Sequence, residues 1–392
     1  MVRSFHTWVR SMFRPGRRGR SPALTVTPLE RRDNPSFAVT FFDVGSGKFF
    51  ARFIGNNDPE SLTVSVATDG FLQHDLVQPD LASPFDFDSS TPGEQRLLST
   101  DVLSISVFSN GGDDSVTLLG PQGATVEAGD GNDVIQAPNA TLGCLLNGGL
   151  GDDLLVAGAG NDFLVGAGGN DTISGGAGND HIEGRDGNDI LRGEDGDDDI
   201  DAGAGLDDSN GGPGANTLLD ADVSAVRLTN TLLRIDGITN RDHGFVSVVL
   251  FGTDGDTTVN AAGYTLGPIE VHAAGGSNSL TGGAGDDILE SNGGLDTTGF
   301  LSGGAGNDNL YAQGNNNRLE GGPGDDLISV ATGEVPVELF AGNVLIGGAG
   351  NDSIDGGGPG TVIEGGAGDD FIISRGGGGV AHGGAGDDFL IG

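Results

Sequence analysis

A nine-residue repeat is the feature that most constrains how this chain can fold. The pattern G-x-G-[ND]-D ends at Asp153 in the main run, and its G-[ND]-D end returns at every ninth residue, at Asp162, Asp171, Asp180, Asp189 and Asp198. Two variants continue the same step and end at Asp207 and Asn216. A fixed short period of this kind is the signature of a stacked repeat architecture, in which each copy packs against its neighbours.

An apolar position accompanies the acidic one. Two residues after each acid, seven of eight positions are aliphatic, the series being Leu155, Leu164, Ile173, Ile182, Leu191, Ile200, Ser209 and Leu218. Each nonamer therefore offers about six turn residues and about three extended residues with an apolar centre. Two nonamers make one coil of 18 residues, and coils stack with parallel strands about 4.8 Å apart. The sequence predicts an all-β fold, a parallel β-roll with a narrow aliphatic core.

A second block keeps the apolar period but loses half of the acids. Full copies end at Asp287, Asp308, Asp326, Asp352, Asp370 and Asp388. The register positions between them include Asn317, Thr361 and Gly379, whereas the apolar positions persist at Ile354, Ile363, Ile372 and Leu390. Because turns on one side of a roll align at intervals of 18 residues, we expect one side of this block to keep an acidic row that the other side has lost.

The residue types in the turns suit a calcium ion. Glycine permits φ > 0 and lets backbone carbonyls face an ion, and aspartate supplies the short, hard carboxylate that Ca²⁺ prefers. We expect several Ca²⁺ ions between successive turns. The predicted metal ligands are Asp133, from an early copy of the motif, and Asp153, Asp162, Asp171, Asp180, Asp189, Asp198, Asp207, Asp287, Asp308, Asp326, Asp352, Asp370 and Asp388.

The repeats resemble a known family. The segment from Gly175 to Glu183 reads GGAGNDHIE and agrees in full with G-G-x-G-x-D-x-U-x, the motif of RTX (hemolysin-type) calcium-binding repeats, where U is large and apolar. The resemblance covers residues 128–219 and 281–392. It implies a parallel β-roll in which aspartate carboxylates and turn carbonyls bind Ca²⁺.

The charge balance points the same way. The chain carries a formal charge of −39 and 75 glycines among 392 residues. Nine Arg and Lys48 against three acids give residues 1–52 a charge of +7, which leaves −46 for the remainder. Such an acidic body excludes nucleic acid as a partner and favours cations. Turn carboxylates about 5 Å apart repel one another by about 1 kcal/mol per pair in water, so we expect Ca²⁺ to drive folding.

Outside the repeats we expect three further segments. Residues 1–36 form a basic tail without fixed structure, the alternative being a short amphipathic helix that touches anionic lipid. Residues 37–127 form a β-rich N-terminal region, and residues 220–280 form a β-rich spacer between block 1 (128–219) and block 2 (281–392). No apolar run is long enough for a transmembrane segment, and the N-terminus lacks the apolar stretch of an ordinary signal peptide.

Two functions remain open at this point. The first is an exported, non-catalytic surface, adhesion or matrix protein, located extracellularly or at the cell surface, with cell-surface polysaccharide or another surface protein as its partner. The second is a secreted β-helical carbohydrate-active enzyme with its catalytic residues in 37–120 or 220–280. The first is favoured because the signatures H-E-x-x-H and G-x-S-x-G are absent. One Trp and two Tyr also supply few sugar-stacking platforms. We therefore expect no catalytic residue.

Overall fold

A computed structural model describes residues 38–43, 49–67, 71–74, 99–223, 225–229, 232–236, 238–241, 243–293, 297–330 and 340–392. All of them belong to one compact unit, Pro35–Gly392. The predicted basic tail, residues 1–36, lies outside the described residues.

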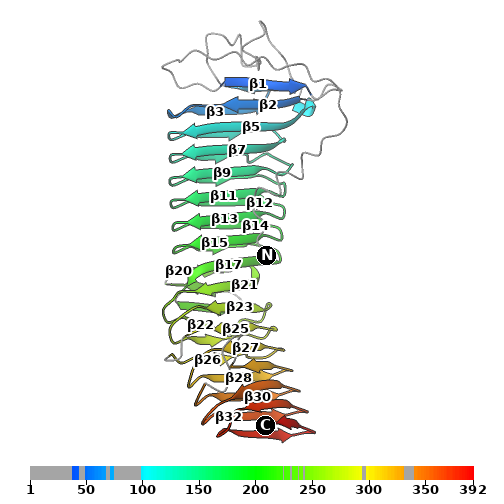
Figure 1. The fold of residues 1–392 in the computed structure, drawn as a ribbon. Coiled ribbons are helices and arrows are strands. Elements are labelled where there is room, and N and C mark those ends of the chain that lie inside the picture. Colours follow the sequence, from blue (N-terminus) through cyan, green and yellow to red (C-terminus); the bar gives the residue numbers. More distant parts are fainter. Residues whose placement is uncertain are drawn as a thin grey trace, which may run out of the picture. The chain divides into compact units, whose positions relative to one another are not determined.

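One long parallel sheet runs through this unit (Figure 1). Its strands pair in parallel from β2 to β35, and only β1 pairs antiparallel, with β2. The long sheet consists of β1 (Ala38–Asp43), β2 (Phe49–Ile54), β5 (Val102–Gly111), β7 (Gly123–Asp130), β9 (Leu145–Leu150), β11 (Phe163–Gly168), β13 (His181–Asp186), β15 (Asp199–Ala204), β17 (Asn216–Val223), β21 (Phe245–Gly252), β23 (Ile269–Ala273), β25 (Ile288–Ser291), β27 (Asn309–Ala312), β29 (Leu327–Ser329), β31 (Ser353–Gly357), β33 (Phe371–Arg375) and β35 (Phe389–Ile391).

Two further sheets face the long sheet, and along the chain their strands alternate with strands of the long sheet. The first facing sheet consists of β3 (Ser61–Val66), β4 (Leu72–His74), β6 (Ser115–Leu118), β8 (Val134–Gln136), β10 (Leu154–Val156), β12 (Thr172–Ala177), β14 (Ile190–Asp195) and β16 (Asp208–Asn210). The second consists of β18 (Ala225–Thr229), β19 (Leu232–Ile235), β20 (Ile238–Arg241), β22 (Thr258–Gly263), β24 (Ser279–Thr281), β26 (Phe300–Ser302), β28 (Arg318–Pro323), β30 (Val344–Ala349), β32 (Val362–Ala367) and β34 (Val380–Ala385).

The predicted parallel β-roll is confirmed, and its period in the first block is the expected one. Leu146 pairs with Leu164, Leu164 with Ile182, and Ile182 with Ile200, each step being one 18-residue coil. In the second block some coils are longer. Leu289 pairs with Leu310, and Ile328 pairs with Ile354, so the strands pair in parallel across coils longer than 18 residues.

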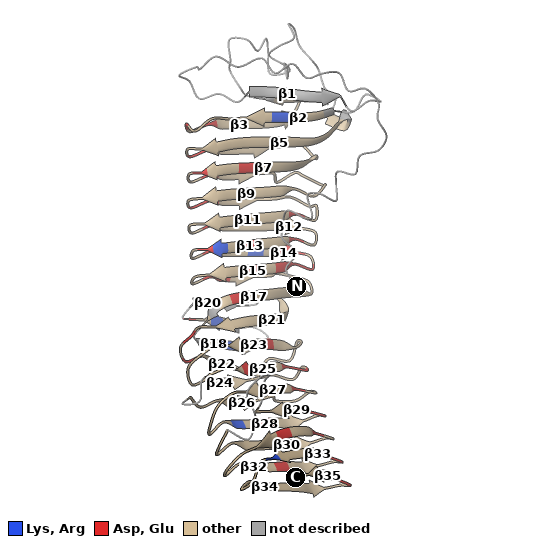
Figure 2. Cartoon of the chain, viewed as in Figure 1, with Lys and Arg blue, Asp and Glu red and all other residues tan. Residues whose placement is uncertain are grey.

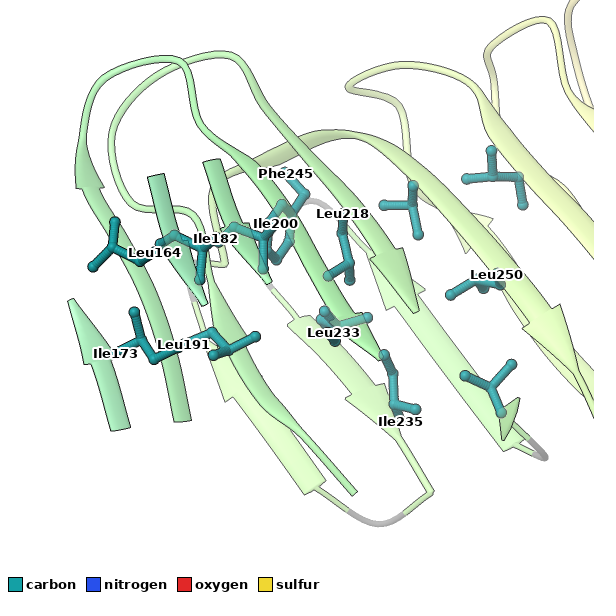
Figure 3. Close-up of a cluster of buried hydrophobic side chains, with 14 of the residues drawn as sticks. Leu164, Ile173, Ile182, Leu191, Ile200, Leu218, Leu233, Ile235, Phe245 and Leu250 are labelled. Atoms are coloured by element: carbon teal, nitrogen blue, oxygen red, sulfur yellow. The ribbon is translucent and has the colours of Figure 1, made fainter. Parts of the chain in front are cut away.

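The aliphatic residues of the repeats form the core between the two layers of strands (Figure 3). Leu164, Ile182 and Ile200 from the long sheet face Ile173 and Leu191 from the first facing sheet, and all five are fully buried. The apolar position that became Ser209 is buried as well. Each fully buried aliphatic side chain contributes about 1.5–3 kcal/mol to stability.

The turns confirm the predicted role of glycine. Gly176 has φ of 105° and Gly178 has φ of 121°, values that non-glycine residues rarely adopt. A Cβ on Gly178 would lie 2.3 Å from the carbonyl oxygen of Gly160, one coil earlier. Glycine is therefore required here both by its backbone conformation and by the close approach of successive coils.

The segment after the first block combines coils with an antiparallel insertion. β18 pairs antiparallel with β19, and β19 pairs antiparallel with β20. β21 resumes the parallel stack on β17, and β22 resumes it on β18. At the start of the stack, β2 and β3 already pair in parallel with β5 and β6. The only helix among the described residues is the 3₁₀ turn η1 (Ser99–Asp101), and none of them forms a helix that could span a membrane.

Candidate calcium sites

The predicted ligands lie in turns along two edges of the roll. We call the turns in which the chain leaves the long sheet the leaving edge, and those in which it comes back the returning edge. Asp133, Asp153, Asp171, Asp189 and Asp207 lie on the leaving edge. Asp162, Asp180, Asp198, Asp287, Asp308, Asp326, Asp352, Asp370 and Asp388 lie on the returning edge. Figure 2 shows acidic residues gathered in the turns at the ends of the stacked strands.

On each edge the aspartates form a hydrogen-bonded ladder. The backbone N–H of Asp153 donates to Oδ1 of Asp171 at 2.8 Å, and that of Asp171 donates to Oδ1 of Asp189 at 2.8 Å. The returning edge repeats the pattern, since the N–H of Asp162 donates to Oδ1 of Asp180 at 2.8 Å. One carboxylate oxygen of each aspartate therefore ties its coil to the preceding coil.

The other oxygen of most of these carboxylates has no hydrogen-bond partner although it is buried. This holds for Oδ2 of Asp133, Asp153, Asp171, Asp180, Asp189, Asp198, Asp207, Asp308, Asp326, Asp352 and Asp370. Three predicted ligands differ. Oδ2 of Asp162 accepts from Gly158 N–H at 3.3 Å, Oδ2 of Asp287 accepts from Gly283 N–H at 2.6 Å, and Asp388 in the last coil is only partly buried. A buried carboxylate oxygen without a donor is costly, so these atoms call for a cation.

A second oxygen, a backbone carbonyl of the next coil, lies near several of these atoms. At Gly347, an added Cβ would lie 2.2 Å from Asp352 Oδ2 and 2.4 Å from the carbonyl oxygen of Gly365 in the next coil. At Gly193 the corresponding distances are 2.2 Å to Asp198 Oδ2 and 2.6 Å to the carbonyl oxygen of Gly211. Oxygens from two successive coils thus converge on the space that the glycine leaves open. Ala128, Ala157 and Ala202 take the glycine's place before Asp133, Asp162 and Asp207.

Burial makes these carboxylates weak acids in the absence of an ion. It raises the pKa of Asp153, Asp180 and Asp308 to about 7, although a backbone hydrogen bond partly opposes the rise. The neighbouring aspartates of the same row add to it by repulsion, as Asp162 and Asp198 do at Asp180. Each carboxylate in a row therefore gains from a bound positive charge.

These donors fit calcium. Among the described residues no three His, Cys, Asp or Glu side chains converge on one point, so each turn offers one carboxylate per coil together with backbone carbonyls. Ca²⁺ accepts both kinds of oxygen. Asp153, Asp180 and their counterparts along the rows would hold it through Oδ2, and the ion would supply the charge that the buried carboxylates lack.

The leaving edge of the second block carries a neutral row at the same positions. The N–H of Gly299 donates to Oδ1 of Asn317 at 2.6 Å, and the N–H of Asn317 donates to Oδ1 of Asn343 at 2.8 Å. The amide nitrogen of Asn317 donates in turn to the Gln313 carbonyl at 3.2 Å, and the hydroxyl of Thr361 donates to the Gly357 carbonyl at 2.7 Å. The ladder survives here without charge. Asn317 and Thr361 point donors at carbonyls that could otherwise face an ion, whereas Nδ2 of Asn343 is buried without a partner.

Two features of the edges were missed by the prediction from sequence. Asp114 begins the row of the leaving edge, since its N–H donates to Oδ1 of Asp133 at 2.7 Å and its own Oδ2 is buried without a partner. Residues 110–114 are recognisable from the sequence as an early motif copy, with Asn110 in place of the first glycine and the buried Val116 two residues after the acid, yet Asp114 was not among the predicted ligands.

The second missed feature is an outer ladder formed by the residue before each aspartate. The N–H of Asn170 donates to Oδ1 of Asp152 at 2.7 Å, and the N–H of Asn188 donates to Oδ1 of Asn170 at 3.0 Å. These side chains are exposed, and they bond toward the following coil, whereas the buried aspartates bond toward the preceding coil. The alternative Asn or Asp at this motif position is explained, because either side chain offers the accepting oxygen.

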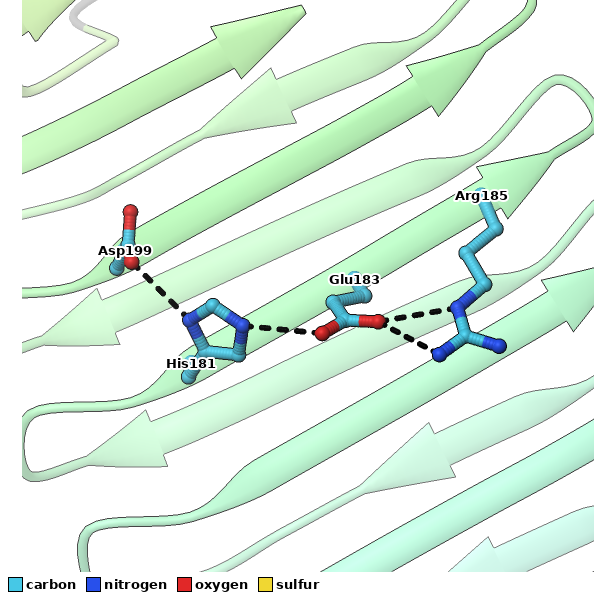
Figure 4. A network of polar contacts seen from close by, with 4 residues as sticks. All are labelled: His181, Glu183, Arg185 and Asp199. Carbon is cyan, nitrogen blue, oxygen red and sulfur yellow. Dashed lines mark hydrogen bonds and ion pairs between the residues drawn. The ribbon is translucent and has the colours of Figure 1, made fainter. Parts of the chain in front are cut away.

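A separate polar network lies on the outer face of the long sheet (Figure 4). His181 contacts Asp199 Oδ2 in the next coil through Nδ1 at 3.1 Å and Glu183 through Nε2 at 3.2 Å. Arg185 donates to the same Glu183 at 2.8 Å. The hydrogen bonds to Asp199 and Glu183 raise the pKa of His181 to about 9. His181 is thus a cationic link between coils, outside the metal rows.

Comparison with known proteins agrees with this geometry. The fold and its turns define a parallel β-roll with acidic edges. A family model for the RTX calcium-binding nonapeptide repeat matches residues 147–182, 183–218, 270–298, 299–328, 341–358 and 362–381. These stretches are RTX calcium-binding nonapeptide repeats, as the sequence predicted. A comparison with curated proteins finds no match for the chain.

Proposed function

We propose that this chain is an exported, non-catalytic surface or matrix protein whose β-roll is ordered by Ca²⁺. The observation that carries the proposal is the set of buried aspartate Oδ2 atoms without hydrogen-bond partners along both edges. Each such atom destabilises the metal-free roll, and each is relieved by an ion between two coils. The free energy of binding therefore becomes free energy of folding.

The location outside the cell follows from the chemistry of the ion. Extracellular calcium modules typically bind with Kd of about 10⁻⁴–10⁻³ M. At the low calcium level of a cytoplasm such sites stay empty, and the carboxylates of the rows repel one another. Outside the cell the sites fill, so the chain folds after export. RTX repeats are also typical of secreted proteins.

A hollow on the neutral edge of the second block supports a role in binding polysaccharide. It encloses about 460 Å³ and is lined by Ser277, Asn278, Ser279, Thr298, Gly299, Phe300, Asn316 and Arg318. Phe300 and Arg318 are both partly exposed there, at 36% and 47%. Hydroxyl and amide groups beside an aromatic ring suit a sugar, and this hollow contains no carboxylate to act as the acid or base of a glycosidase.

Far-UV circular dichroism of the full chain tests the folding proposal. The chain is treated with EGTA, then titrated with CaCl₂, and in parallel with MgCl₂. We expect a coil spectrum that becomes β-type with Ca²⁺ and not with Mg²⁺, which demands near-ideal octahedral geometry. A β-type spectrum that EGTA leaves unchanged would overturn the proposal, because the roll would then stand on its aliphatic core alone.

The non-catalytic part of the proposal needs its own test. The calcium-loaded chain is applied to a glycan array and, in parallel, to polysaccharide hydrolysis and lyase assays. Binding without cleavage is expected. Cleavage of any polymer would instead support the carbohydrate-active enzyme, and an Arg318→Ala variant would show whether bound glycan occupies the hollow on the neutral edge.

A further inference from the structure

One buried carboxyl group lies outside the repeat motif, at the end of the first block. Counting in 18-residue coils, the long sheet carries Gly148, Gly166, Gly184 and Ala202 at one position, and the next coil carries Asp220 there. Asp201 pairs with Leu219, the register then shifts before Ala204 pairs with Ala221, and Asp220 pairs with Leu250 in the coil beyond. A charged side chain thus stands where every earlier coil has glycine or alanine.

Asp220 points into the roll. Along β17, Leu218 and Asp220 are buried at 0% and 1% exposure, while Leu219 and Ala221 between and after them are partly exposed. Oδ2 of Asp220 has no hydrogen-bond partner. A buried carboxylate oxygen without a donor or a cation destabilises the charged form of the group.

The position of Asp220 places it beside the last aspartate of the leaving edge in this block. One coil earlier, the space beside Gly184 is met by Asp189 Oδ2 at 2.5 Å and by the carbonyl oxygen of Ala202 at 2.5 Å. The same step of 18 residues places Asp207 and the backbone of Asp220 beside Ala202, whose methyl group takes the glycine's place. The final coil therefore adds the buried carboxylate of Asp220 to the carbonyl oxygen that the earlier coils offer.

The nearest charges increase the need for a cation. After burial, repulsion from Asp207 is the largest cause that raises the pKa of Asp220, and Asp236 and Asp201 add to it. The arginines of the first block are engaged elsewhere, since Arg192 pairs with Asp208 at 2.8 Å and Arg185 pairs with Glu183 at 2.8 Å. Among the described residues, neither Asp207 nor Asp220 has an ion pair, and Oδ2 of both is buried without a partner.

No further motif turn stacks above Asp207. The chain passes from β17 to the antiparallel strands β18–β20, which contact β16 at the end of the first facing sheet. We propose that Asp207 and Asp220 form a terminal Ca²⁺ site that fixes the end of the first block to the segment following it. This inference rests on the proposed calcium function, and it adds a ligand that the nonapeptide motif does not contain.

Hydrogen–deuterium exchange of the full chain, followed by mass spectrometry, tests the site locally. In the wild-type protein, saturating calcium should slow exchange both in peptides from 150–190 and in peptides from 205–223. At a calcium concentration 100 times Kd the protection is about 100-fold. In Asp220→Asn the protection by calcium should persist in 150–190 and fall at least tenfold in 205–223, while far-UV circular dichroism with calcium stays β-type.

Two further variants keep the test decisive. Asp220→Ala reproduces Ala202 of the preceding coil, so it fits the position and should behave as Asp220→Asn does. Asp201→Asn removes one charge from the outer face of the neighbouring strand and should leave protection in 205–223 unchanged. Equal protection of 205–223 in the wild type and in both Asp220 variants would overturn the terminal site. Absence of calcium protection in 150–190 of the wild type would overturn the proposed function itself.

Discussion

The two edges of the second block have the same backbone but different chemistry. On the returning edge, Asp308, Asp326 and Asp352 each accept a backbone N–H through Oδ1 and bury a second oxygen without a partner. On the leaving edge, Asn317 and Asn343 accept the equivalent backbone N–H groups of the preceding coil through their side-chain oxygens. The ladder of hydrogen bonds is common to both edges, but only the returning edge carries carboxylates in its buried row.

This difference separates the requirements of the fold from those of the metal. The stacking of coils needs an accepting oxygen at the last position of the motif, which Asn supplies as well as Asp. Calcium needs the second, charged oxygen, which only Asp supplies. The neutral edge therefore folds without an ion, and the acidic edge makes the same block depend on one.

The largest effect should come from making the acidic edge resemble the neutral one. In the triple variant Asp308→Asn, Asp326→Asn, Asp352→Asn, the ladder persists and the ion-binding oxygens disappear. Calcium at 100 times Kd stabilises by about 2.7 kcal/mol per site, and this stabilisation should vanish for each site lost. Hydrogen–deuterium exchange of peptides from 309–330 and 353–373, compared with calcium and with EGTA, measures this stabilisation.

The control for this variant uses the outer ladder. Asp325→Asn and Asp369→Asn remove the same kind of charge from exposed positions where Asn307 and Asn351 already alternate with aspartate. The calcium effect should survive in this double variant. Loss of the effect in the control, or its survival in the triple variant, would contradict the assignment of the buried row as ligands.

The reverse substitutions, from Asn to Asp, should give the next largest effect. Asn317→Asp and Asn343→Asp place carboxylates in the buried neutral row, where no ion is expected at present. Without calcium, each unpaired buried group should destabilise the block by about 1–3 kcal/mol. Thermal unfolding at a fixed calcium concentration just sufficient to fold the wild-type chain measures this loss against Asn351→Asp, which adds a charge at an exposed position. Unchanged stability would mean that the edge tolerates charge and that the two rows do not differ as described.

The pH dependence of the metal-free chain distinguishes the edges again. Burial raises the pKa of Asp153, Asp180 and Asp308 to about 7, above the ordinary value of 3.8. The stability that a raised carboxyl pKa contributes is complete below the unfolded value and is lost as pH rises through the folded value. In EGTA, the far-UV circular dichroism spectrum should therefore show more β structure at pH 5 than at pH 8, with a slope of at most about 1.4 kcal/mol per pH unit per group.

The sign of this dependence is the informative part. Calcium should cancel the dependence between pH 6 and 8, because the ion replaces the protons on the carboxylates. In the triple Asp→Asn variant the dependence should be weaker even without calcium. A metal-free chain that gains stability as pH rises from 5 to 8 would contradict the burial of these carboxylates in the folded state.

The smallest effect is expected on the outer face. Asp199→Asn removes one of the two carboxylates that contact His181, whose side chain is 36% exposed. Because surface ion pairs contribute about 0–1 kcal/mol, stability should change little and calcium protection not at all. The pKa of His181, followed by NMR, should fall from about 9. A loss of calcium protection would place this network in the metal sites.

Much of the fold could be predicted from the repeat because both of its signals are local and periodic. The apolar residues Leu164, Ile173 and Ile182 indicated the core, and the spaced glycines indicated the turns. The division of each carboxylate into a ladder oxygen and a free oxygen could not be predicted, since it depends on the relation between coils. Asp220 was missed for a similar reason, because its burial depends on how β17 stacks on β15, where the register of the two strands shifts.

The most direct test of the account is the location of calcium in crystals of the full chain, from anomalous diffraction at a long wavelength. The account predicts peaks beside the buried aspartates of both edges in the first block and beside Asp308, Asp326, Asp352 and Asp370 on the returning edge of the second. It predicts none beside Asn317 and Asn343. Peaks along the Asn row, or a folded roll without peaks at the aspartate rows, would contradict it.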